Sequence, residues 1–411
     1  MRIFILMLLL LIADPVFAKP LELHRGVGVH EWLNWSPLAP GGTYRWPPYQ
    51  SVDEWRSRYR ELSDWPAGNE FARIKSLGFD FVRLTVDPGP LLIADEEKRQ
   101  EALAVLAGDV KLITAVGLKV VFNLHIVTQV PAYSGETMIE KAADDPNVLR
   151  YIDMTADVAK MLALLGTDKV AFEPFNEPQH YPCDGKGDGQ WQKIMAEAMA
   201  AIRAVTSQLT VIATGACGGD VVGLADLDPS FDDPNLLYSF HMYDPHLFTH
   251  QQASEAGEFA SGLPWPASSG SPGAVLEALR AHMTAAGVGD AEQVRTILSL
   301  TPVIAQYFAE DWGEKQLEEG FALVLDWAAK HDIPTSRLFM GEFGVIAMSD
   351  DGRRGAPEPD RLRYLAAVRH LAEMNHIPWS VWEYSNPWGM SIIKPDGPAI
   401  PDAPMLQALG L

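Results

Sequence analysis

The sequence predicts one (β/α)8 TIM barrel with loop insertions, and three observations favour this fold class. Eight short strand-like runs alternate with helical segments along the chain. Polar side chains follow several of these runs, at the edge where parallel α/β folds gather their functional residues. The sequence contains no internal repeat, low-complexity tract or linker that would mark a second domain.

The strand-like runs are short and apolar, as buried parallel strands are, and Pro174 and Pro178 limit how far the fourth one can extend. Strands are predicted over residues 26–30, 81–84, 119–125, 170–172, 210–213, 236–241, 338–344 and 378–384. A doubly wound open sheet is the alternative fold. It would place a glycine-rich phosphate turn after the first strand, and the sequence Gly-Val-Gly-Val-His-Glu at 26–31 lacks that spacing.

The intervening segments have helical periodicity and recognisable ends. Ser51 is typical of a helix start and Gly78 of a helix stop. Helices are predicted over residues 51–77, 96–115, 149–165, 190–206, 274–285, 314–331, 360–374 and 404–409. Residues 245–272 form a long insertion rich in Ser, Gly and Pro, and ordered insertions of this length are usually functional loops.

Residues 1–18 have the pattern of a secretory signal. Arg2 is followed by the apolar run 3–12 and by Val16-Phe17-Ala18, a small-residue cleavage site. The apolar run is half as long as the roughly 20 residues that a membrane span needs, which argues against an anchor. We therefore expect a mature chain of residues 19–411, forming a single catalytic domain that is secreted or periplasmic, monomeric and without a membrane span.

The formal net charge of −22 argues against nucleic acid and anionic membranes as partners, because an acidic surface repels both. The chain has two cysteines, Cys183 and Cys217, and each follows a strand end. In an oxidising compartment they would be able to pair, and two free thiols are the alternative. We expect them to approach each other on the catalytic face.

The candidate functional residues lie at or near the carboxyl ends of six predicted strands. In a barrel these ends form one rim, so residues far apart in sequence converge on one cleft. One polar residue at a strand end is commonly structural, but nine together indicate a site. They are Arg83, Asn123, His125, Asn176, Glu177, His241, Tyr243, Glu342 and Trp382.

Two of these residues, Glu177 and Glu342, are carboxylic acids on different strands. Glycoside hydrolysis uses such a pair: one acid protonates the leaving oxygen, and the other attacks the sugar carbon or activates water. Gly341 and Gly344 flank the second acid and leave room for a close approach. For a retaining enzyme the carboxyl groups should lie about 5–5.5 Å apart, against roughly 6.5–9.5 Å for an inverting one.

The motifs Asn176-Glu177-Pro178, His241-x-Tyr243 and Gly341-Glu342-Phe343-Gly344, in this order, resemble family 5 of the glycoside hydrolases, the cellulase family. Arg83 within Val-Arg-Leu, His125 after Asn-Leu and Trp382 on the last strand fit the same pattern, so the resemblance covers nearly the whole mature chain. It implies a retaining β-glycosidase with Glu177 as acid/base and Glu342 as nucleophile, without a metal or other cofactor. The first strand and the 245–272 insertion depart from the usual family pattern.

The other rim residues have expected supporting roles. Arg83 and the Tyr243 hydroxyl would keep Glu342 ionised, by charge and by hydrogen bonding. His125 and His241 would bind sugar hydroxyls or orient the carboxylates. Asn176 would donate to the sugar 2-hydroxyl, and Trp382 would offer a flat apolar face to a pyranose ring.

Several residues have competing interpretations. Glu173 is a rival acid, which we interpret instead as a buried partner of an arginine. Glu383 is a rival nucleophile, but as the neighbour of Trp382 it should point to the opposite face. A metal site would draw on His241, His246 and His250. Trp32, Trp35, Trp265 and Trp388 are either sugar platforms or packing residues.

The expected substrate is a β-linked polysaccharide or oligosaccharide, and the leading hypothesis is an endo-β-1,4-glucanase. A β-mannanase, a β-1,3-glucanase, a glycosidase acting on glycolipid and an exopolysaccharide-processing glycanase are the alternatives. A non-catalytic polysaccharide-binding barrel would not need to keep both Glu177 and Glu342. Substrate choice would depend on loops such as 36–50 and 245–272.

Overall fold

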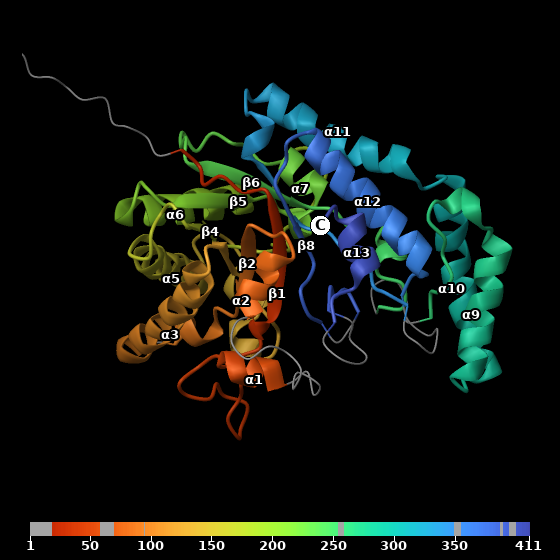
Figure 1. The fold of residues 1–411 in the computed structure, drawn as a ribbon, viewed down its shortest axis with the longest axis horizontal. Helices are drawn as coiled ribbons and strands as arrows, with labels where there is room; N and C mark the ends of the chain where they lie inside the picture. The colour runs from red at the N-terminus through yellow and green to blue at the C-terminus, as the bar shows by residue number, and fades with distance from the viewer. Residues whose placement is uncertain are drawn as a thin grey trace, which may run out of the picture.

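Eight parallel strands close into a barrel, which confirms the predicted fold class (Figure 1). The computed structural model describes residues 19–57, 70–93, 95–253, 259–348, 355–386, 389–393 and 400–411. Each strand pairs with its neighbours in chain order, and β1 closes the ring by pairing with β8. The strands are β1 (Arg25–Leu33), β2 (Phe81–Val86), β3 (Lys119–Leu124), β4 (Val170–Glu173), β5 (Thr210–Thr214), β6 (Leu236–His241), β7 (Leu338–Glu342) and β8 (Trp379–Val381).

Helices surround this barrel, and most lie close to their predicted ranges. The helix predicted over 96–115 has those bounds, because Asp95 caps it by accepting hydrogen bonds from the backbone N–H groups of Glu97 and Lys98. The helices are α1 (Val52–Ser57), α2 (Glu70–Ser76), α3 (Glu96–Ala115), α4 (Gly135–Met138), α5 (Pro146–Ala163), α6 (Gly189–Val205), α7 (Val221–Ala225), α8 (His246–Thr249), α9 (Pro272–Ala285), α10 (Asp290–Ala309), α11 (Glu314–Lys330), α12 (Glu358–Met374) and α13 (Ala403–Ala408).

The helix predicted over 51–77 is described only at its two ends, as α1 and α2, and its middle lies outside the described residues. The last strand is shorter than the predicted 378–384. After Val381 the chain leaves the regular ladder, because the backbone N–H of Glu383 donates to the carbonyl of Met390 and that of Tyr384 to the carbonyl of Gly28.

The structure adds a helix that the sequence reading did not predict. α10 packs beside α9, and Figure 1 shows the two helices standing away from the barrel at one side. Pro302 lies within α10 and interrupts the helical pattern in the sequence, although its side chain is exposed and the helix continues past it. The predicted insertion therefore leads into α9 and α10, which together we call the helical arm.

An apolar cluster, which we call the N-terminal plug, fills the barrel at the end where the strands begin. Leu21 and Leu23 enter the barrel from the chain before β1, and the backbone N–H of Leu21 donates to Oγ1 of Thr210. They pack against inward-facing residues near the start of six strands: Phe81, Val121, Ala171, Ile212, Leu237 and Phe339. Because this end is closed by apolar side chains, the polar rim at the opposite end is the available site for chemistry.

Candidate active site

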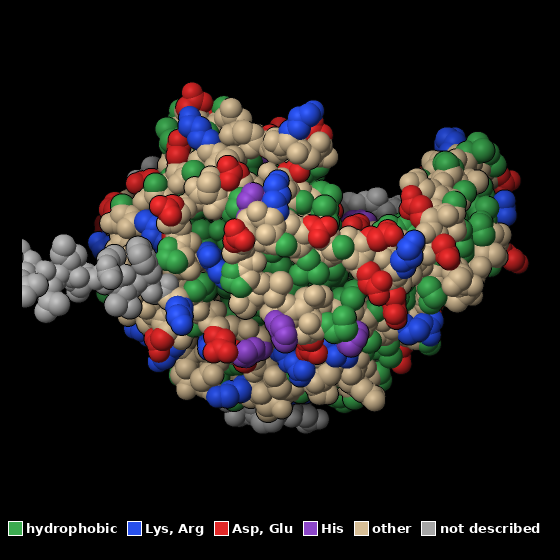
Figure 2. All heavy atoms as spheres, turned by 90° about the horizontal axis from the view of Figure 1, so that it is seen from above, with side chains coloured by type: hydrophobic (Ala, Val, Ile, Leu, Met, Phe, Trp, Pro, Cys, Tyr) green, Lys and Arg blue, Asp and Glu red, His purple; other side chains and the backbone are tan. Residues whose placement is uncertain are grey.

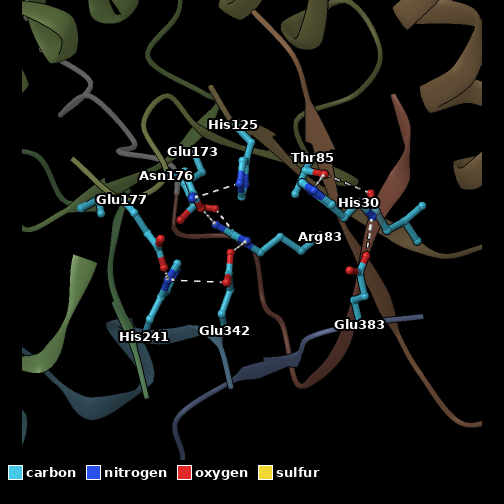
Figure 3. Close-up of polar contacts among 12 residues, drawn as sticks. His30, Arg83, Thr85, His125, Glu173, Asn176, Glu177, His241, Glu342 and Glu383 are labelled. Carbon is cyan, nitrogen blue, oxygen red and sulfur yellow. Dashed lines mark hydrogen bonds and ion pairs between the residues drawn. The ribbon is translucent and has the colours of Figure 1, made fainter. Parts of the chain in front are cut away.

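Arg83 lies at the centre of the polar rim, fully buried on β2, and its guanidinium contacts Glu173 and two predicted site residues (Figure 3). Its Nε donates to Oε2 of Glu173 at 2.7 Å and its Nη1 to Oε1 of Glu342 at 2.5 Å. Its Nη2 donates to Oδ1 of Asn176 at 2.7 Å. Burial opposes the arginine charge, but the two carboxylates raise the pKa of Arg83 above its ordinary value. The predicted pairing of Glu173 with an arginine is confirmed.

Glu342, the last residue of β7, is held from two sides. Arg83 donates to Oε1, and the Tyr243 hydroxyl donates to Oε2 at 2.8 Å. Burial and the charge of Glu342 raise the pKa of Tyr243 well above its ordinary value, so the phenol stays a donor. The two hydrogen bonds hold both carboxylate oxygens of Glu342 in fixed positions, as an oriented nucleophile requires.

Glu177 lies opposite Glu342 and is more accessible, with 35% of its side chain exposed against 5% for Glu342. Nδ1 of His241 lies 2.7 Å from Oε1 of Glu177 and 3.7 Å from Oε2 of Glu342. One oxygen of each carboxylate and a ring nitrogen of His241 lie within 4.8 Å of one another. The two acids are therefore close enough to act on one glycosidic bond from opposite sides.

His125, Asn176 and Trp382 form a wall beside this pair. The rings of His125 and Trp382 stack with centroids 5.7 Å apart, and Nδ2 of Asn176 lies 3.4 Å from Nε2 of His125. Because Arg83 occupies Oδ1 of Asn176, the amide group is turned so that Nδ2 remains the donor. Burial lowers the pKa of His125 well below its ordinary value, so its ring is neutral.

His30 is a site residue that the sequence reading missed. Its ring lies 4.9 Å from that of His125 and 4.7 Å from that of Trp382, between centroids. Trp35 Nε1 donates to Nε2 of His30 at 3.1 Å, and Nδ1 of His30 lies 3.1 Å from Oγ1 of Thr85. Burial lowers the pKa of His30 to about 3. Its position at the end of the first predicted strand is the same signal that identified the other rim residues.

Glu383, the rival nucleophile, is fully buried and turned away from Glu177 (Figure 3). Its carboxylate accepts from the backbone N–H of His30 and from Nδ2 of Asn386. Burial raises the pKa of Glu383 well above its ordinary value, which keeps the acid protonated. A buried neutral acid in this position can support His30, but it cannot attack a substrate.

The segment that carries Glu177 is tied to the turn after β5. Cys183 and Cys217 form a disulfide with Cα atoms 6.0 Å apart, which confirms the predicted approach of the two cysteines. In the turn, the backbone N–H of Cys217 donates to the carbonyl of His180. Gly219 has a φ of +73°, and a Cβ there would lie 3.5 Å from Cγ of Glu177, so a glycine suits this close approach.

Comparison with known proteins identifies the family. The sequence profile described as Cellulase (glycosyl hydrolase family 5) matches residues 44–387.

The chain belongs to glycosyl hydrolase family 5.

It is therefore an O-glycosyl hydrolase, and retention of the anomeric configuration is characteristic of family 5. The chain is 29% identical over 251 residues to endoglucanase 3 of Fibrobacter succinogenes, covering 59% of this chain and 34% of that protein. It is 24% identical over 346 residues to endoglucanase C of Acetivibrio thermocellus, covering 80% of this chain and 88% of that protein. The chain thus spans about a third of the first relative and most of the second.

Solved structures share the fold. Endoglucanase Cel5A of Thermotoga maritima superposes with a TM-score of 0.63 at 19% identity, covering 94% of this chain and 96% of that chain. The cellulose synthase subunit Z of Clostridioides difficile superposes with a TM-score of 0.61 at 21% identity, covering 94% and 99%. Among the described helices, none is long and apolar enough to cross a membrane.

The geometry of the site also raises the question of a metal cation, because Glu177, His241 and Glu342 each offer a ligand atom. Both oxygens of Glu342 already accept hydrogen bonds, one of them from the Arg83 cation. A positive charge at this distance disfavours a second cation. The expectation that family 5 chemistry proceeds here without a metal remains a prediction.

The tryptophans divide by exposure. Trp32 and Trp265 are buried and serve packing, with Trp32 stacked on Trp55. Trp35 is partly exposed beside His30 and remains a candidate sugar platform. Trp388 lies outside the described residues.

Proposed function

We propose that this family 5 enzyme is a secreted endo-β-1,4-glucanase in which Glu177 is the acid/base and Glu342 the nucleophile. The observation that carries the proposal is the pair of carboxylates, one oxygen of each lying within 4.8 Å of the other. That spacing suits a carboxyl separation of about 5–5.5 Å, the separation of retaining enzymes. The endoglucanase names of the two relatives favour a β-1,4-glucan as substrate.

In the first step, Glu342 attacks the anomeric carbon while Glu177 gives its proton to the leaving glycosidic oxygen. The products are a glycosyl ester on Glu342, a released sugar end and an ionised Glu177. In the second step, Glu177 takes a proton from water as the water oxygen attacks the same carbon and displaces Glu342. Two inversions at one carbon give net retention.

The surrounding residues support these two steps. Arg83 and Tyr243 hold the carboxylate of Glu342 in position for attack. Nδ2 of Asn176 is the donor available for the sugar 2-hydroxyl, a contact that strengthens as positive charge develops at the anomeric carbon. His125 and Trp382 offer a neutral aromatic surface to the ring of the bound sugar.

Substrate choice is tested with a panel of polysaccharides. The panel contains carboxymethylcellulose, mixed-linkage β-glucan, β-1,3-glucan, β-mannan and cello-oligosaccharides. Mannan belongs in it because the Thermotoga fold neighbour was solved with cellobiose and with mannotriose. Cello-oligosaccharides belong in it because one relative, from Ruminococcus flavefaciens, is named cellodextrinase A. We expect the highest kcat/KM on β-1,4-glucans, with a rapid fall in viscosity that marks internal cleavage.

The control for this panel is the double variant Glu177→Gln/Glu342→Gln. It keeps the barrel and the binding surface but removes both acids. A wild-type protein that binds the polysaccharides and hydrolyses none of them faster than this variant would instead be a non-catalytic binding barrel. Preference for mannan or β-1,3-glucan would replace the substrate but leave the chemistry in place.

The two glutamates are assigned by the product that each single variant forms with azide. Glu177→Ala should still form the glycosyl ester from an activated aryl glycoside, because a low-pKa leaving group needs no proton. Azide then intercepts that ester and gives the β-glycosyl azide. Glu342→Ala forms no ester, so with azide it can give only the α-linked product. The opposite pair of products would reverse the two roles.

Secretion is part of the proposal and is supported by the Cys183–Cys217 disulfide, because disulfides persist in oxidising compartments. The leader at residues 1–18 would direct export, and cleavage after Ala18 would leave Lys19 as the first residue. Intact-mass measurement of the exported protein tests the cleavage site. A protein retained in the cytoplasm with residue 1 intact would contradict it.

A further inference from the structure

The ring of His241 has a second side that the catalytic pair does not use. Nδ1 faces Glu177, whereas Nε2 is buried and meets no hydrogen-bonding partner among the described residues (Figure 3). His241 is only 2% exposed, so bulk water cannot supply that partner. A buried ring nitrogen normally has one.

A second unpartnered polar atom points to the same place. Oγ of Ser239, two residues earlier on β6, is fully buried and also meets no partner among the described residues. A Cβ built on Gly341 would lie 2.9 Å from this oxygen and 2.9 Å from Nε2 of His241. The two polar atoms therefore lie on the same side of Gly341, and we call the region between them the Gly341 notch.

The notch has a structural cause in the β6–β7 ladder. The register runs from Phe240↔Met340 to His241↔Glu342, so Gly341 is the extra residue of a bulge. A bulge re-aims the residue that follows it, here Glu342. A side chain on Gly341 would collide with His241 or Ser239, so a glycine suits the bulge that positions the nucleophile.

We propose that the Gly341 notch binds one ordered water, and that this water and the hydroxyl of Ser239 together form the second hydrogen-bonding partner of His241. The role of Ser239 is that of a positioning residue, because it acts on Glu177 through the imidazole ring. This inference rests on the proposed role of Glu177 as acid/base.

The chemistry of the two steps explains why such a partner is useful. In both steps, Oε1 of Glu177 accepts a hydrogen bond from Nδ1–H of His241. The other carboxyl oxygen of Glu177 gives the proton in the first step and takes one from water in the second. A neutral ring with its proton on Nδ1 needs a donor at Nε2, and a charged ring needs an acceptor there. Water and a serine hydroxyl can each do both, so the proton facing Glu177 stays in place.

The charges around His241 favour holding a proton there. Burial alone lowers the pKa of His241, but the charge of Glu342 and the hydrogen bond to Glu177 raise it above its ordinary value. The charged or titratable groups that face the ring are Glu177, Glu342, Arg83, His125, Asp220 and Tyr243. Because Glu177 and His241 are in contact, the proton that matters for catalysis is held by the pair.

The test measures how kcat/KM depends on pH for two aryl β-cellobiosides. Phenyl β-cellobioside needs a proton on its leaving group, and 2,4-dinitrophenyl β-cellobioside does not. Ser239→Ala should move the alkaline limb with the phenyl substrate to lower pH by about half a unit or more, because the pair holds its proton less firmly. With the dinitrophenyl substrate the variant should match the wild type, since its first step needs no acid.

The matched control is Ser380→Ala. Ser380 is another buried serine of a barrel strand whose Oγ is unpartnered among the described residues, but it lies on β8. The Ser380→Ala variant should leave the pH profiles of both substrates unchanged. An unchanged limb in Ser239→Ala, or an equal shift in both variants, would overturn the proposal, because the effect would then be absent or a general result of emptying the barrel.

A crystal structure of the wild-type enzyme provides a second test that needs no variant. Density for a water within about 3.2 Å of Nε2 of His241 and of Oγ of Ser239 is expected, and an empty notch would contradict the proposal. Failure here is distinguishable from failure of the acid/base assignment. If Glu177 were not the acid, Glu177→Ala would hydrolyse phenyl β-cellobioside at the wild-type rate, whereas failure of the water proposal alone leaves that variant impaired.

Discussion

Arg83 shows at the scale of one residue how the site combines stability with reactivity. Its planar guanidinium makes three hydrogen bonds in three directions, to Glu173, Glu342 and Asn176. Ion pairs with Glu173 and Glu342 balance the charge of Arg83, so that the arginine can be buried. A lysine would carry the same charge but cannot make this fork of contacts.

We therefore expect Arg83→Lys to lower the free energy of unfolding by about 3 kcal/mol and kcat/KM by about a hundredfold or more. The first effect follows from unpaired buried groups, and the second from the altered position of Glu342 and Asn176. Urea unfolding and hydrolysis of an aryl β-cellobioside measure the two effects.

Arg361→Lys is the matched control. Arg361 is also buried and donates from Nη2 to Oδ2 of Asp402 at 2.7 Å, but it lies on α12 and contacts no candidate site residue named here. It should lose stability and keep kcat/KM within about twofold. A variant of Arg83 that lost stability alone would show that the arginine is a plain structural ion pair.

The sequence allowed most of the rim to be predicted, because a polar residue after a buried apolar run stands out. Arg83, His125, Asn176, Glu177, His241 and Glu342 all carry that signal, and the structure brings them together (Figure 3). The pairing of Glu173 with an arginine was predicted, but which arginine it contacts was not. Glu173 lies inside the apolar run and faces Arg83, whereas Glu177 lies after the run, in the Asn-Glu-Pro motif, and faces the cleft.

At the scale of elements, the turn after β5 supports the segment that follows β4. The disulfide closes a loop between residues 34 positions apart and joins the Glu177 segment to the turn that packs beneath it. Cys183→Ser/Cys217→Ser should lower the free energy of unfolding by up to about 4 kcal/mol on the chain-entropy model. Thermal unfolding of the variant, and of the wild type with and without reductant, measures this.

The same variant should lose kcat more than it changes KM, because the looser segment carries the acid/base. Reductant should have no effect on the variant, since no disulfide remains. If the reduced wild type and the variant both unfolded at the wild-type temperature, the two cysteines would not constrain the loop.

A second prediction at this scale concerns Asp109 on α3. Burial raises the pKa of Asp109 from 3.8 to about 7, and its Oδ2 meets no partner among the described residues. The folded state therefore binds a proton that the unfolded state has already released. Stability from this group is complete below about pH 4 and is lost as the pH rises towards 7.

Asp109→Asn removes this titration. Its free energy of unfolding, relative to wild type, should rise by about 1–3 kcal/mol between pH 5 and pH 8, as measured by urea unfolding. Asp53→Asn is the control, because the side chain of Asp53 is 93% exposed. A difference that stays constant with pH, or the same trend in the control, would show that Asp109 titrates normally.

The elements also show where sequence reasoning stops. The helix over 96–115 was predicted to the residue from its periodicity, and the structure adds the Asp95 cap at its start. α10 was not predicted; Pro302 lies inside it, and the helix packs on α9. The helix α10 depends on tertiary contacts, which a local sequence pattern does not contain.

On the scale of the whole molecule, the barrel separates stability from catalysis along its axis. The N-terminal plug fills the end where the strands begin, and the candidate site lies at the end where they finish. Leu23, which is 5% exposed, belongs to the plug. Leu23→Ala should cost about 2–4 kcal/mol in unfolding free energy and leave kcat within about twofold.

Leu164→Ala is the control for this substitution, because Leu164 is 83% exposed and should contribute little. Both variants are compared by urea unfolding and by hydrolysis of an aryl glycoside. A fall in kcat in Leu23→Ala at a temperature where the variant is fully folded would mean that the two ends are coupled.

The substrate is the property of the whole molecule that one sequence cannot supply. Acidic and basic side chains are interspersed on the face shown in Figure 2, so the net charge of −22 does not point to a partner. The helical arm also carries exposed apolar residues, among them Val294 and Leu298. Specificity depends on loops and arms of this kind, whose contacts with a glycan have no local sequence signature.

The N-terminal plug also determines where a carrier domain or a solid support can be attached without blocking the cleft. Because Leu21 and Leu23 enter the barrel at the end opposite Glu177 and Glu342, anything joined ahead of residue 19 is held on the far side from the cleft. A carrier domain, a surface anchor or a resin linked there should leave the cleft open to a long insoluble polymer. For a linkage made through the helical arm, the position of the plug does not ensure that the cleft stays accessible.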